Sequence, residues 1–257
     1  MQNTEVFEKF LDSKYGRRIL EEFNKEKRFI ENPADLIVKK INNKTNIDDY
    51  LDVGGGTGVR TLKIMKGLGI THIDFLEPAK KAPLDFCKKV PKLGLDVNII
   101  RSRFEDFKPV KKYDLITSVH TWYYIDLNSL ERLYDLLKAG GVACIFMDSE
   151  KDTIKKIQEI CESNFLKYKT NNAEDVCRQL DKLRIKYTVH KDEKTFSGLL
   201  KNGKYTKRAK IMMSLVSYAK WSDIPKETKI SVKKMLQGIS KKDRYPSRRW
   251  LIVIRNN

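Results

Sequence analysis

A cluster of glycines after a short apolar run is the strongest chemical signal in this 257-residue sequence. Residues 50–53 (YLDV) predict a short strand, and residues 54–58 (GGGTG) follow it directly. Glycine lets a backbone turn tightly and approach a ligand closely, and a helix that begins there presents free N–H groups to a polar ligand. The spacing does not fit the dinucleotide fingerprint G-x-G-x-x-G, because Val59 takes the place of the third glycine, nor a phosphate loop, because no Lys-Ser or Lys-Thr pair follows. A plain structural turn is the alternative interpretation.

A carboxylate, Glu77, ends the second predicted strand, 19 residues after Gly58. A carboxylate can accept both hydroxyl protons of a ribose, because it has about four lone-pair sites on one rigid group. An ordinary surface glutamate at a strand end is the alternative. The distance from the glycine cluster favours the ribose role.

Two further patterns follow in order along the chain. Residues 113–116 (YDLI) predict a strand, and residues 136–142 (LLKAGGV) predict a helix end and a chain reversal at two glycines. Together with the glycine cluster and Glu77, they resemble the motifs of class I S-adenosylmethionine-dependent methyltransferases, whose first motif is D-x-G-x-G-x-G. The resemblance covers residues 50–147 and implies S-adenosylmethionine as the cofactor. The implied cofactor contacts are Asp52, Gly54, Gly56 and Gly58 at the methionine half and Glu77 at the ribose.

The sequence departs from that family after the third predicted strand. The family often has an acidic residue there that binds the adenine amino group, and Arg103 stands at this place. Because arginine only donates hydrogen bonds, it cannot accept one from an adenine amine. Two alternatives stay open: stacking and backbone contacts near Phe104, or substitution by Glu105. Val119, at the end of the fourth predicted strand, is a further expected cofactor contact.

Residues 118–125 (SVHTWYYI) follow the fourth predicted strand, at the sheet edge where open α/β sheets bind ligands. We therefore expect this segment to face both cofactor and acceptor. His120 is the candidate general base, since an unperturbed histidine has a pKa of about 6.5, and Tyr123 is the second candidate catalytic residue. In the alternative interpretation the aromatic side chains only pack a helix onto the sheet. The candidate substrate contacts are Trp122 and Tyr124, which could surround a cation, and Tyr15.

Within the family, the chain resembles the histamine N-methyltransferase group of small-molecule methyltransferases. The resemblance rests on residues 10–13 (FLDS), 22–23 (EF), 77–78 (EP) and 123–124 (YY), and on a helical insert before a final apolar strand. In that group the N-terminal helices and the insert cover the acceptor. The chain departs from the group at Gly16, where the group has a glutamate that binds the imidazole of histamine. An acceptor with negative charge therefore suits this chain better than histamine.

The elements that position these residues alternate between strand and helix. Apolar runs predict strands at residues 50–53, 72–77, 97–101, 113–120, 142–147, 185–190 and 250–254. Helical spacing predicts helices within 4–43, interrupted before Pro33, and at 57–66, 79–89, 128–138 (with Asn128 as its cap), 151–165, 172–183 and through 196–240. Alternation of this kind implies a mainly parallel sheet with helices on both faces. The predicted fold is α/β: a Rossmann-like, seven-stranded, mostly parallel sheet with N-terminal helices and a helical insert before the last strand.

The predicted domains differ in charge. We expect an N-terminal helical cap over residues 1–47, a cofactor-binding core over 48–195 and 246–257, and a basic helical lid or substrate region over 196–245. The formal charge of the chain is +18, and residues 191–257 hold 18 Lys and Arg against 5 Asp and Glu, a net charge of +13. This excess indicates either an anionic partner or a solvated basic face.

Other features of the sequence exclude several classes of protein. No apolar run approaches the ~20 residues that a membrane helix needs, so no membrane partner is expected. The first ten residues lack the pattern of a secretory signal. The four cysteines are far apart and form no CxxC pair, so neither a disulfide framework nor a metal site is expected. These observations favour the cytoplasm.

Three functions are compatible with the sequence. The first is methylation of nitrogen or oxygen on a small, negatively charged molecule. The alternative is an RNA or protein methyltransferase that uses the basic C-terminal region as its substrate platform. The third is a non-catalytic binding module, against which the complete glycine motif and Glu77 argue.

Overall fold

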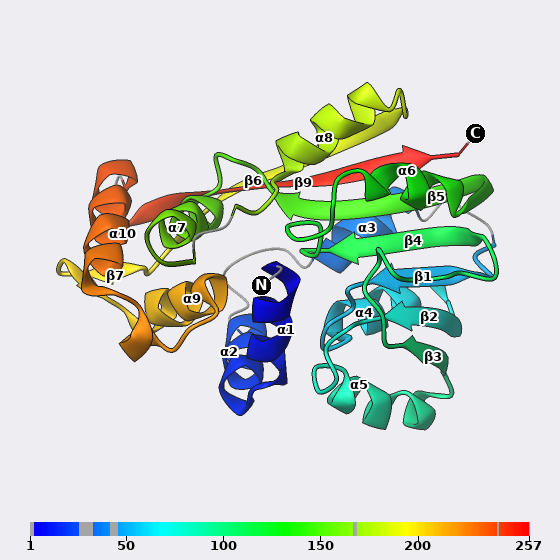
Figure 1. Cartoon of the computed structure of the whole chain (residues 1–257), viewed down its shortest axis with the longest axis horizontal. Coiled ribbons are helices and arrows are strands. Elements are labelled where there is room, and N and C mark those ends of the chain that lie inside the picture. Colours follow the sequence, from blue (N-terminus) through cyan, green and yellow to red (C-terminus); the bar gives the residue numbers. More distant parts are fainter. Residues whose placement is uncertain (1–2, 26–32, 42–45, 167–168, 241, 257) are drawn as a thin grey trace. The chain divides into compact units, whose positions relative to one another are not determined.

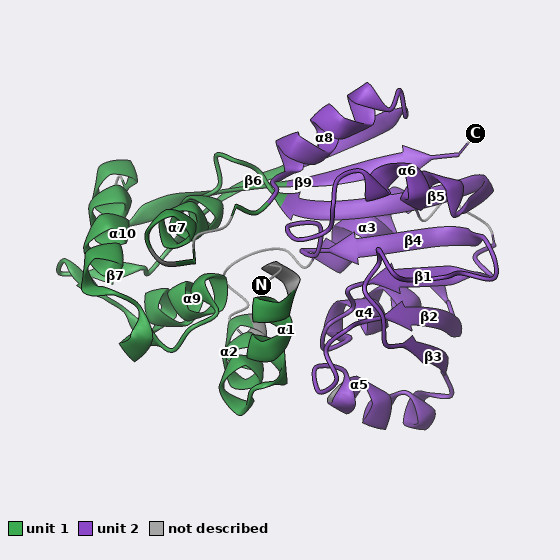
Figure 2. Ribbon diagram, viewed as in Figure 1, with its two compact units in different colours: residues 1–30, 148–170, 192–249 green, residues 31–147, 171–191, 250–257 purple. Residues whose placement is uncertain are grey.

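The computed structural model describes residues 3–25, 33–41, 46–166, 169–240 and 242–256. The chain divides into two compact units, each assembled from segments that are distant in the sequence (Figure 2). Unit 1 consists of residues 1–30, 148–170 and 192–249, and unit 2 consists of residues 31–147, 171–191 and 250–257. The division into a cap, a core and a lid stays a prediction.

A seven-stranded sheet has the order β3-β2-β1-β4-β5-β9-β6 (Figure 1). Neighbouring strands among the first five run parallel. β9 runs antiparallel to β5, since backbone hydrogen bonds join Gly141 to Asn256 at one end and Ser149 to Arg248 at the other. The predicted seven-stranded, mostly parallel α/β fold is therefore confirmed. The strands are β1 (Tyr50–Val53), β2 (His72–Leu76), β3 (Asp96–Ile100), β4 (Tyr113–Val119), β5 (Leu137–Asp148), β6 (Tyr187–Ser197) and β9 (Arg244–Arg255).

Helices cover both faces of the sheet in unit 2. On β4, Ile116 belongs to one hydrophobic cluster and Leu115 to another, because successive side chains of a strand point to opposite faces. The cluster of Ile116 includes side chains of α6 (Ser129–Asp135) and α8 (Ala173–Lys182). The cluster of Leu115 includes side chains of α3 (Pro33–Ile41), α4 (Val59–Leu68) and α5 (Leu84–Lys89), which is followed by the short helix η1 (Pro91–Leu93).

Unit 1 has a hydrophobic core of its own, to which α7, α9 and α10 contribute most of the side chains. Its first two helices meet at Ser13, whose hydroxyl donates to the carbonyl of Phe10 (2.7 Å) and accepts from the N–H of Gly16 (2.8 Å). Its elements are α1 (Asn3–Asp12), α2 (Lys14–Lys25), α7 (Thr153–Cys161), η2 (Glu162–Leu166), β7 (Leu200–Lys201), β8 (Lys204–Tyr205), α9 (Lys207–Ser217), η3 (Trp221–Asp223) and α10 (Lys226–Ile239).

Three of the predicted helices are wrong in extent. The helix predicted over 79–89 does not begin until Leu84. The helix predicted through 196–240 does not begin until Lys207, because β6 extends to Ser197 and the β7–β8 hairpin follows. Gly198, Asn202 and Gly203 have φ angles of 85°, 50° and 66°, which a right-handed helix does not allow. The helix predicted over 128–138 ends at Asp135, since β5 already begins at Leu137, and the side chain of Asn128 does not cap it.

The described residues show neither a membrane span nor a metal cluster. None of their helices is long and apolar enough to cross a bilayer. They contain no group of three or more His, Cys, Asp and Glu side chains that could hold a metal ion. The four cysteines are free thiols.

Candidate active site

The glycine loop connects β1 to α4 and uses its three motif glycines for different purposes. Gly54, Gly56 and Gly58 have φ angles of 70°, 57° and 68°, in the left-handed region that favours glycine. A Cβ at Gly54 would lie 2.2 Å from Cγ2 of Thr121, and one at Gly58 would lie 2.3 Å from the ring of Phe86. A Cβ at Gly56 would meet no atom within 4 Å. Gly54 and Gly58 therefore leave room for the side chains of Thr121 and Phe86, whereas Gly56 faces open space.

Asp52 holds the base of this loop in place. Its buried carboxylate accepts hydrogen bonds from Thr61 on α4 (2.5 Å) and from Thr117 on β4 (2.7 Å). Thr117 is in turn 2.7 Å from the hydroxyl of Tyr50. Burial raises the pKa of Asp52, although the hydrogen bonds from Thr61 and Thr117 lower it. Both oxygen atoms have partners inside the fold, so the structure favours a positioning role for this predicted cofactor contact.

Glu77 joins the glycine loop to the end of β2. Its side chain is 4% exposed. One carboxylate oxygen accepts from the N–H of Gly56 (2.8 Å), and the other accepts from the N–H of Ala79 (2.8 Å). The carbonyl of Ala79 also accepts from Arg101 (2.6 Å). Two of the predicted cofactor residues, Glu77 and Gly56, are thus brought into direct contact.

The segment after β3 is held by Arg132 of α6. This arginine donates to the carbonyls of Phe104 (2.9 Å) and Glu105 (2.8 Å), and its guanidinium lies 5.5 Å from the centre of the Phe104 ring. The Glu105 carboxylate accepts from the N–H of Asp126 (3.2 Å). Phe104 is buried and packs against Trp122, so its backbone is better placed than its ring to contact a ligand.

The segment after β4 lies against the glycine loop. The hydroxyl of Thr121 donates to the carbonyl of Gly54 (3.3 Å). His120 has a φ of 59°, which is uncommon outside glycine and is often found at functional sites. The ring Nδ1 of His120 is 2.8 Å from the hydroxyl of Tyr123, and the backbone N–H of His120 donates to the carbonyl of Phe146 (2.9 Å). The two predicted catalytic residues, His120 and Tyr123, therefore form a hydrogen-bonded pair. Val119, which immediately precedes His120, is half-buried.

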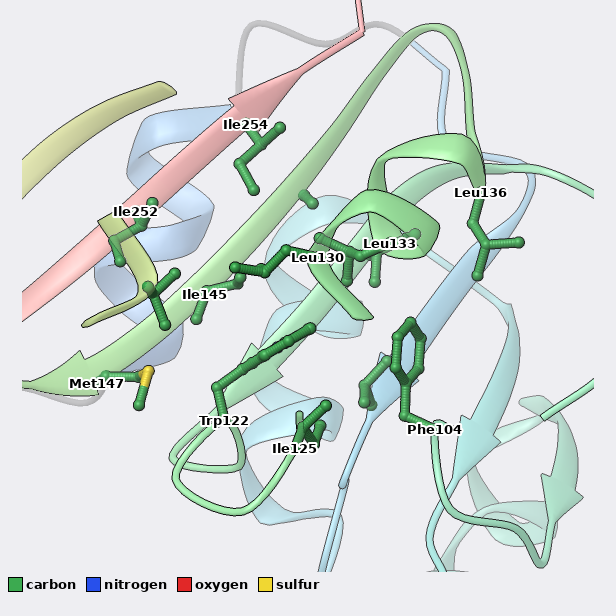
Figure 3. Close-up of a cluster of buried hydrophobic side chains, with 14 of the residues drawn as sticks. Phe104, Trp122, Ile125, Leu130, Leu133, Leu136, Ile145, Met147, Ile252 and Ile254 are labelled. Atoms are coloured by element: carbon green, nitrogen blue, oxygen red, sulfur yellow. The ribbon is translucent and has the colours of Figure 1, made fainter. Parts of the chain in front are cut away.

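The predicted substrate contacts have different surroundings. Trp122 is fully buried in the cluster that also contains Phe104 and Ile145 (Figure 3), which favours the packing interpretation for this residue. Tyr124 is half-buried and packs edge-on against Tyr123, with ring centres 6.1 Å apart. Tyr15 belongs to unit 1, where its hydroxyl donates to Ser214 (3.0 Å).

Asn171 is a functional candidate that the sequence reasoning missed. Its side-chain amide donates to the carbonyls of Trp122 and Ile125, both at 2.9 Å, and its backbone N–H donates to the carbonyl of Tyr123 (3.0 Å). Three hydrogen bonds from one residue thus fix the segment that holds the His120–Tyr123 pair. No local pattern could have indicated this, because Asn171 lies almost fifty residues further along the chain.

Gly16 cannot be replaced by an acidic anchor in this fold. A Cβ at this position would lie 1.9 Å from the carbonyl oxygen of Phe10, because the turn at Ser13 brings α1 and α2 together. The backbone around Gly16 therefore leaves no room for the glutamate that the histamine group has at this position.

Comparisons with known proteins agree with this fold. The family model described as a methyltransferase domain matches residues 7–183. The chain therefore belongs to the family of methyltransferase domains. The malonyl-[acyl-carrier protein] O-methyltransferase 2 of Ilyobacter polytropus is 32% identical over 157 residues, which are 58% of this chain and 59% of that protein. The chain thus spans about three fifths of the length of this curated relative.

Solved structures show the same fold at low sequence identity. A methyltransferase of Bacillus halodurans C-125 has a TM-score of 0.64 at 11% identity, over 86% of this chain and 97% of its own. The N-methyltransferase NodS of Bradyrhizobium japonicum WM9, solved with S-adenosyl-L-homocysteine, has a TM-score of 0.51 at 12% identity, over 88% of this chain and 89% of its own. The shared feature is the arrangement of the sheet and its helices.

Proposed function

We propose that the protein transfers the methyl group of S-adenosylmethionine to a nitrogen or oxygen atom of a small acceptor with negative charge. The observation that carries the proposal is the buried Glu77 carboxylate, which accepts from the N–H of Gly56 where the loop faces open space. The His120–Tyr123 pair lies on the segment that contacts the same loop through Thr121. One local structure therefore offers groups for the cofactor and groups for an acceptor.

The residues around the glycine loop fit this cofactor. A carboxylate has about four lone-pair sites, so Glu77 can hold the loop and accept from ribose hydroxyls with the same group. The first N–H groups of α4 have no side-chain cap, and such N–H groups suit a polar or anionic ligand. We assign Glu77 to the ribose and residues 54–58 to the methionine half. We assign Phe104, which follows β3, and Val119, at the end of β4, to the border of the adenine.

The His120–Tyr123 pair would accept the proton that an acceptor such as a hydroxyl group releases on methylation. The bound cofactor supplies an electrophilic methyl group on a sulfonium, so the chain mainly has to orient the acceptor and exclude water. If Nδ1 of His120 donates to the Tyr123 hydroxyl, the lone pair on Nε2 can accept a proton. A hydroxyl acceptor requires this base, whereas a neutral amine or a carboxylate does not. Tyr124 and Tyr15 stay proposed acceptor contacts.

Two observations support an acceptor with negative charge. Residues 191–257 carry a net charge of +13, which attracts anions and repels cationic amines. The curated relative from Ilyobacter polytropus acts on a malonyl-[acyl-carrier protein], whose malonyl group ends in a carboxylate. The likeness to the histamine N-methyltransferase group supports a small acceptor, and Gly16 argues against histamine itself.

The direct test is methyl transfer from labelled S-adenosylmethionine to an extract of the source cells. The products are separated into small molecules, nuclease-sensitive polymer and protease-sensitive polymer, and the last fraction is treated with hydroxylamine, which cleaves thioesters. Label in small molecules, or label released by hydroxylamine, supports the proposal. Label that stays in RNA or protein would replace it with the polymer-modifying alternative.

The role of the base is tested on the same acceptor. With a hydroxyl acceptor, His120→Ala should lower kcat by ~10²-fold, and Tyr123→Phe should lower it less, since the imidazole remains. With an amine or carboxylate acceptor, both variants should retain kcat. Binding of the cofactor should be unchanged in both, which separates loss of the base from loss of the fold.

A further inference from the structure

The outward face of α10 carries a row of lysines around one exposed apolar side chain. Thr228, Val232 and Leu236 face the core of unit 1. Another side of the helix, which we name the α10 stripe, has spacings of three, one, three and one residues over about 12 Å, with Lys226, Ile230 and Lys234 exposed and Lys229 and Lys233 half-buried. Ile230, at its centre, is 45% exposed. The α10 stripe consists of Lys226, Lys229, Ile230, Lys233 and Lys234.

The lysines of the α10 stripe lack acidic partners. Among the described residues, none of its four ammonium groups pairs with a carboxylate. Lys226 and Lys229 are separated by three residues and Lys229 and Lys233 by four, and like charges at both spacings destabilise a helix. The first turn also holds Glu227, the acidic side chain that the helix dipole favours there, and it forms no ion pair with these lysines. A row of like charges without acidic partners breaks a local rule of helix stability, as functional surfaces often do.

The aromatic side chain beside the stripe is already covered by lysines. Nζ of Lys229 lies 4.8 Å and Nζ of Lys210 lies 5.6 Å from the centre of the Trp221 ring. The ring of Tyr205 packs edge-on against the same tryptophan, with centres 5.1 Å apart. Trp221 therefore orients two lysines instead of offering an open ring on which a nucleobase could stack.

We propose that the α10 stripe is a docking surface for an acidic protein that carries the acceptor. Four lysines that lack acidic partners match a surface of Asp and Glu side chains, and the exposed Ile230 gives the centre of the contact an apolar anchor. A nucleic-acid backbone would use the lysines but not the isoleucine, so the stripe fits a protein better than RNA. The statement that the partner carries the acceptor rests on the proposed function, whereas the docking surface does not.

The test measures binding of the full chain to a purified, labelled acyl carrier protein as the acidic probe. The variant Lys226→Glu with Lys234→Glu reverses two charges of the stripe and places a carboxylate in the first turn, which favours the helix. The matched control is Lys201→Glu with Lys204→Glu, which makes the same change of charge on the exposed β7–β8 hairpin of the same unit. Ile230→Ser tests the apolar anchor, and cofactor binding is measured in every variant.

The proposal expects the stripe variant to weaken carrier binding by at least about tenfold and the hairpin control by about twofold or less. Ile230→Ser should weaken carrier binding and leave any binding of RNA unchanged. Three results would each overturn the proposal. These are no binding of the carrier, equal losses in the stripe variant and the hairpin control, and tighter binding of RNA than of the carrier. If the carrier binds but its thioester-bound acceptor is not methylated, the docking surface stands and the proposed acceptor is wrong.

Discussion

Two buried carboxylates near the glycine loop and two buried cations of unit 1 are held differently. In unit 2, the carboxylates of Asp52 and Glu77 accept hydrogen bonds from neutral groups, namely threonine hydroxyls and backbone N–H groups. In unit 1, the buried Lys155 lies 3.9 Å from the carboxylate of Glu162, and the buried Arg249 pairs with Asp192. Neutral donors fix a carboxylate without cancelling its charge, whereas an ion pair cancels it. The comparison indicates that Glu77 keeps a charge that a ligand can use, whereas the ion pairs of Lys155 and Arg249 serve stability.

The largest expected effect concerns Lys155 in unit 1. Its side chain is fully buried and donates to both oxygen atoms of Thr170, at 2.6 and 3.0 Å. Lys155→Met leaves Glu162 buried without its cation and should lower the free energy of unfolding by about 3–5 kcal/mol. Denaturant titration measures the loss. The double variant Lys155→Met with Glu162→Gln should recover a large part of it, and a single variant with wild-type stability would contradict the comparison.

The second effect concerns Glu77 in unit 2. Glu77→Gln removes a charged acceptor and should weaken S-adenosylmethionine by ~10²-fold in titration calorimetry, because hydrogen bonds to a charged group contribute about 1.5–3 kcal/mol. The matched control is Glu105→Gln, whose carboxylate accepts from the N–H of Asp126. Unchanged affinity in Glu77→Gln would contradict the ribose assignment. A loss in Glu105→Gln would instead favour Glu105 as the adenine contact.

The third effect separates positioning from stability within one short segment. Asn171→Ala removes the side-chain bonds to Trp122 and Ile125 and should lower kcat/KM for the acceptor by about tenfold, since a small misplacement of catalytic groups is costly. Its neighbour Asn172 caps α8 by accepting from the N–H of Asp175 (2.9 Å). Asn172→Ala should cost about 1 kcal/mol of stability with kcat/KM nearly unchanged. Equal kinetic losses in both variants would reduce Asn171 to a structural role.

The last prediction is a pH dependence that originates in unit 1. Burial and repulsion by Asp148 raise the pKa of Asp152 to about 8. Between its ordinary pKa of 3.8 and this value the folded state binds a proton that the unfolded state lacks, so stability should fall as pH rises through this window. Asp152→Asn should flatten the slope of unfolding free energy between pH ~5 and ~8. An unchanged slope would show that other groups produce it.

The sequence predicted the parts of the fold that short-range rules determine. The glycine motif, Glu77 and the first five strands follow from spacing and apolar runs, and the structure has them in the predicted order. The His120–Tyr123 pair was predicted only as two separate candidates, because their hydrogen bond depends on the positive φ of His120.

The remaining features depend on contacts between distant residues. Asn171 reaches the segment after β4 from the start of α8, and no periodicity reveals such a bond. Arg249 belongs to the basic stretch 191–257, yet it is 1% exposed and pairs with Asp192. The hairpin before α9 was hidden because its strands are two residues long, which is too short for an alternating pattern.

The place of β9 in the sheet has a consequence for biosynthesis. β6 ends at Ser197 and joins the sheet through β9, which begins only at Arg244. At the usual pace of a ribosome the nascent β6 waits roughly several seconds for its neighbour. An unpaired strand invites pairing with other chains, and charged side chains discourage it. The four consecutive charged residues at 191–194 (KDEK), in the middle of β6, should discourage such pairing both in the growing polypeptide and in the finished sheet, where β6 stays at the edge.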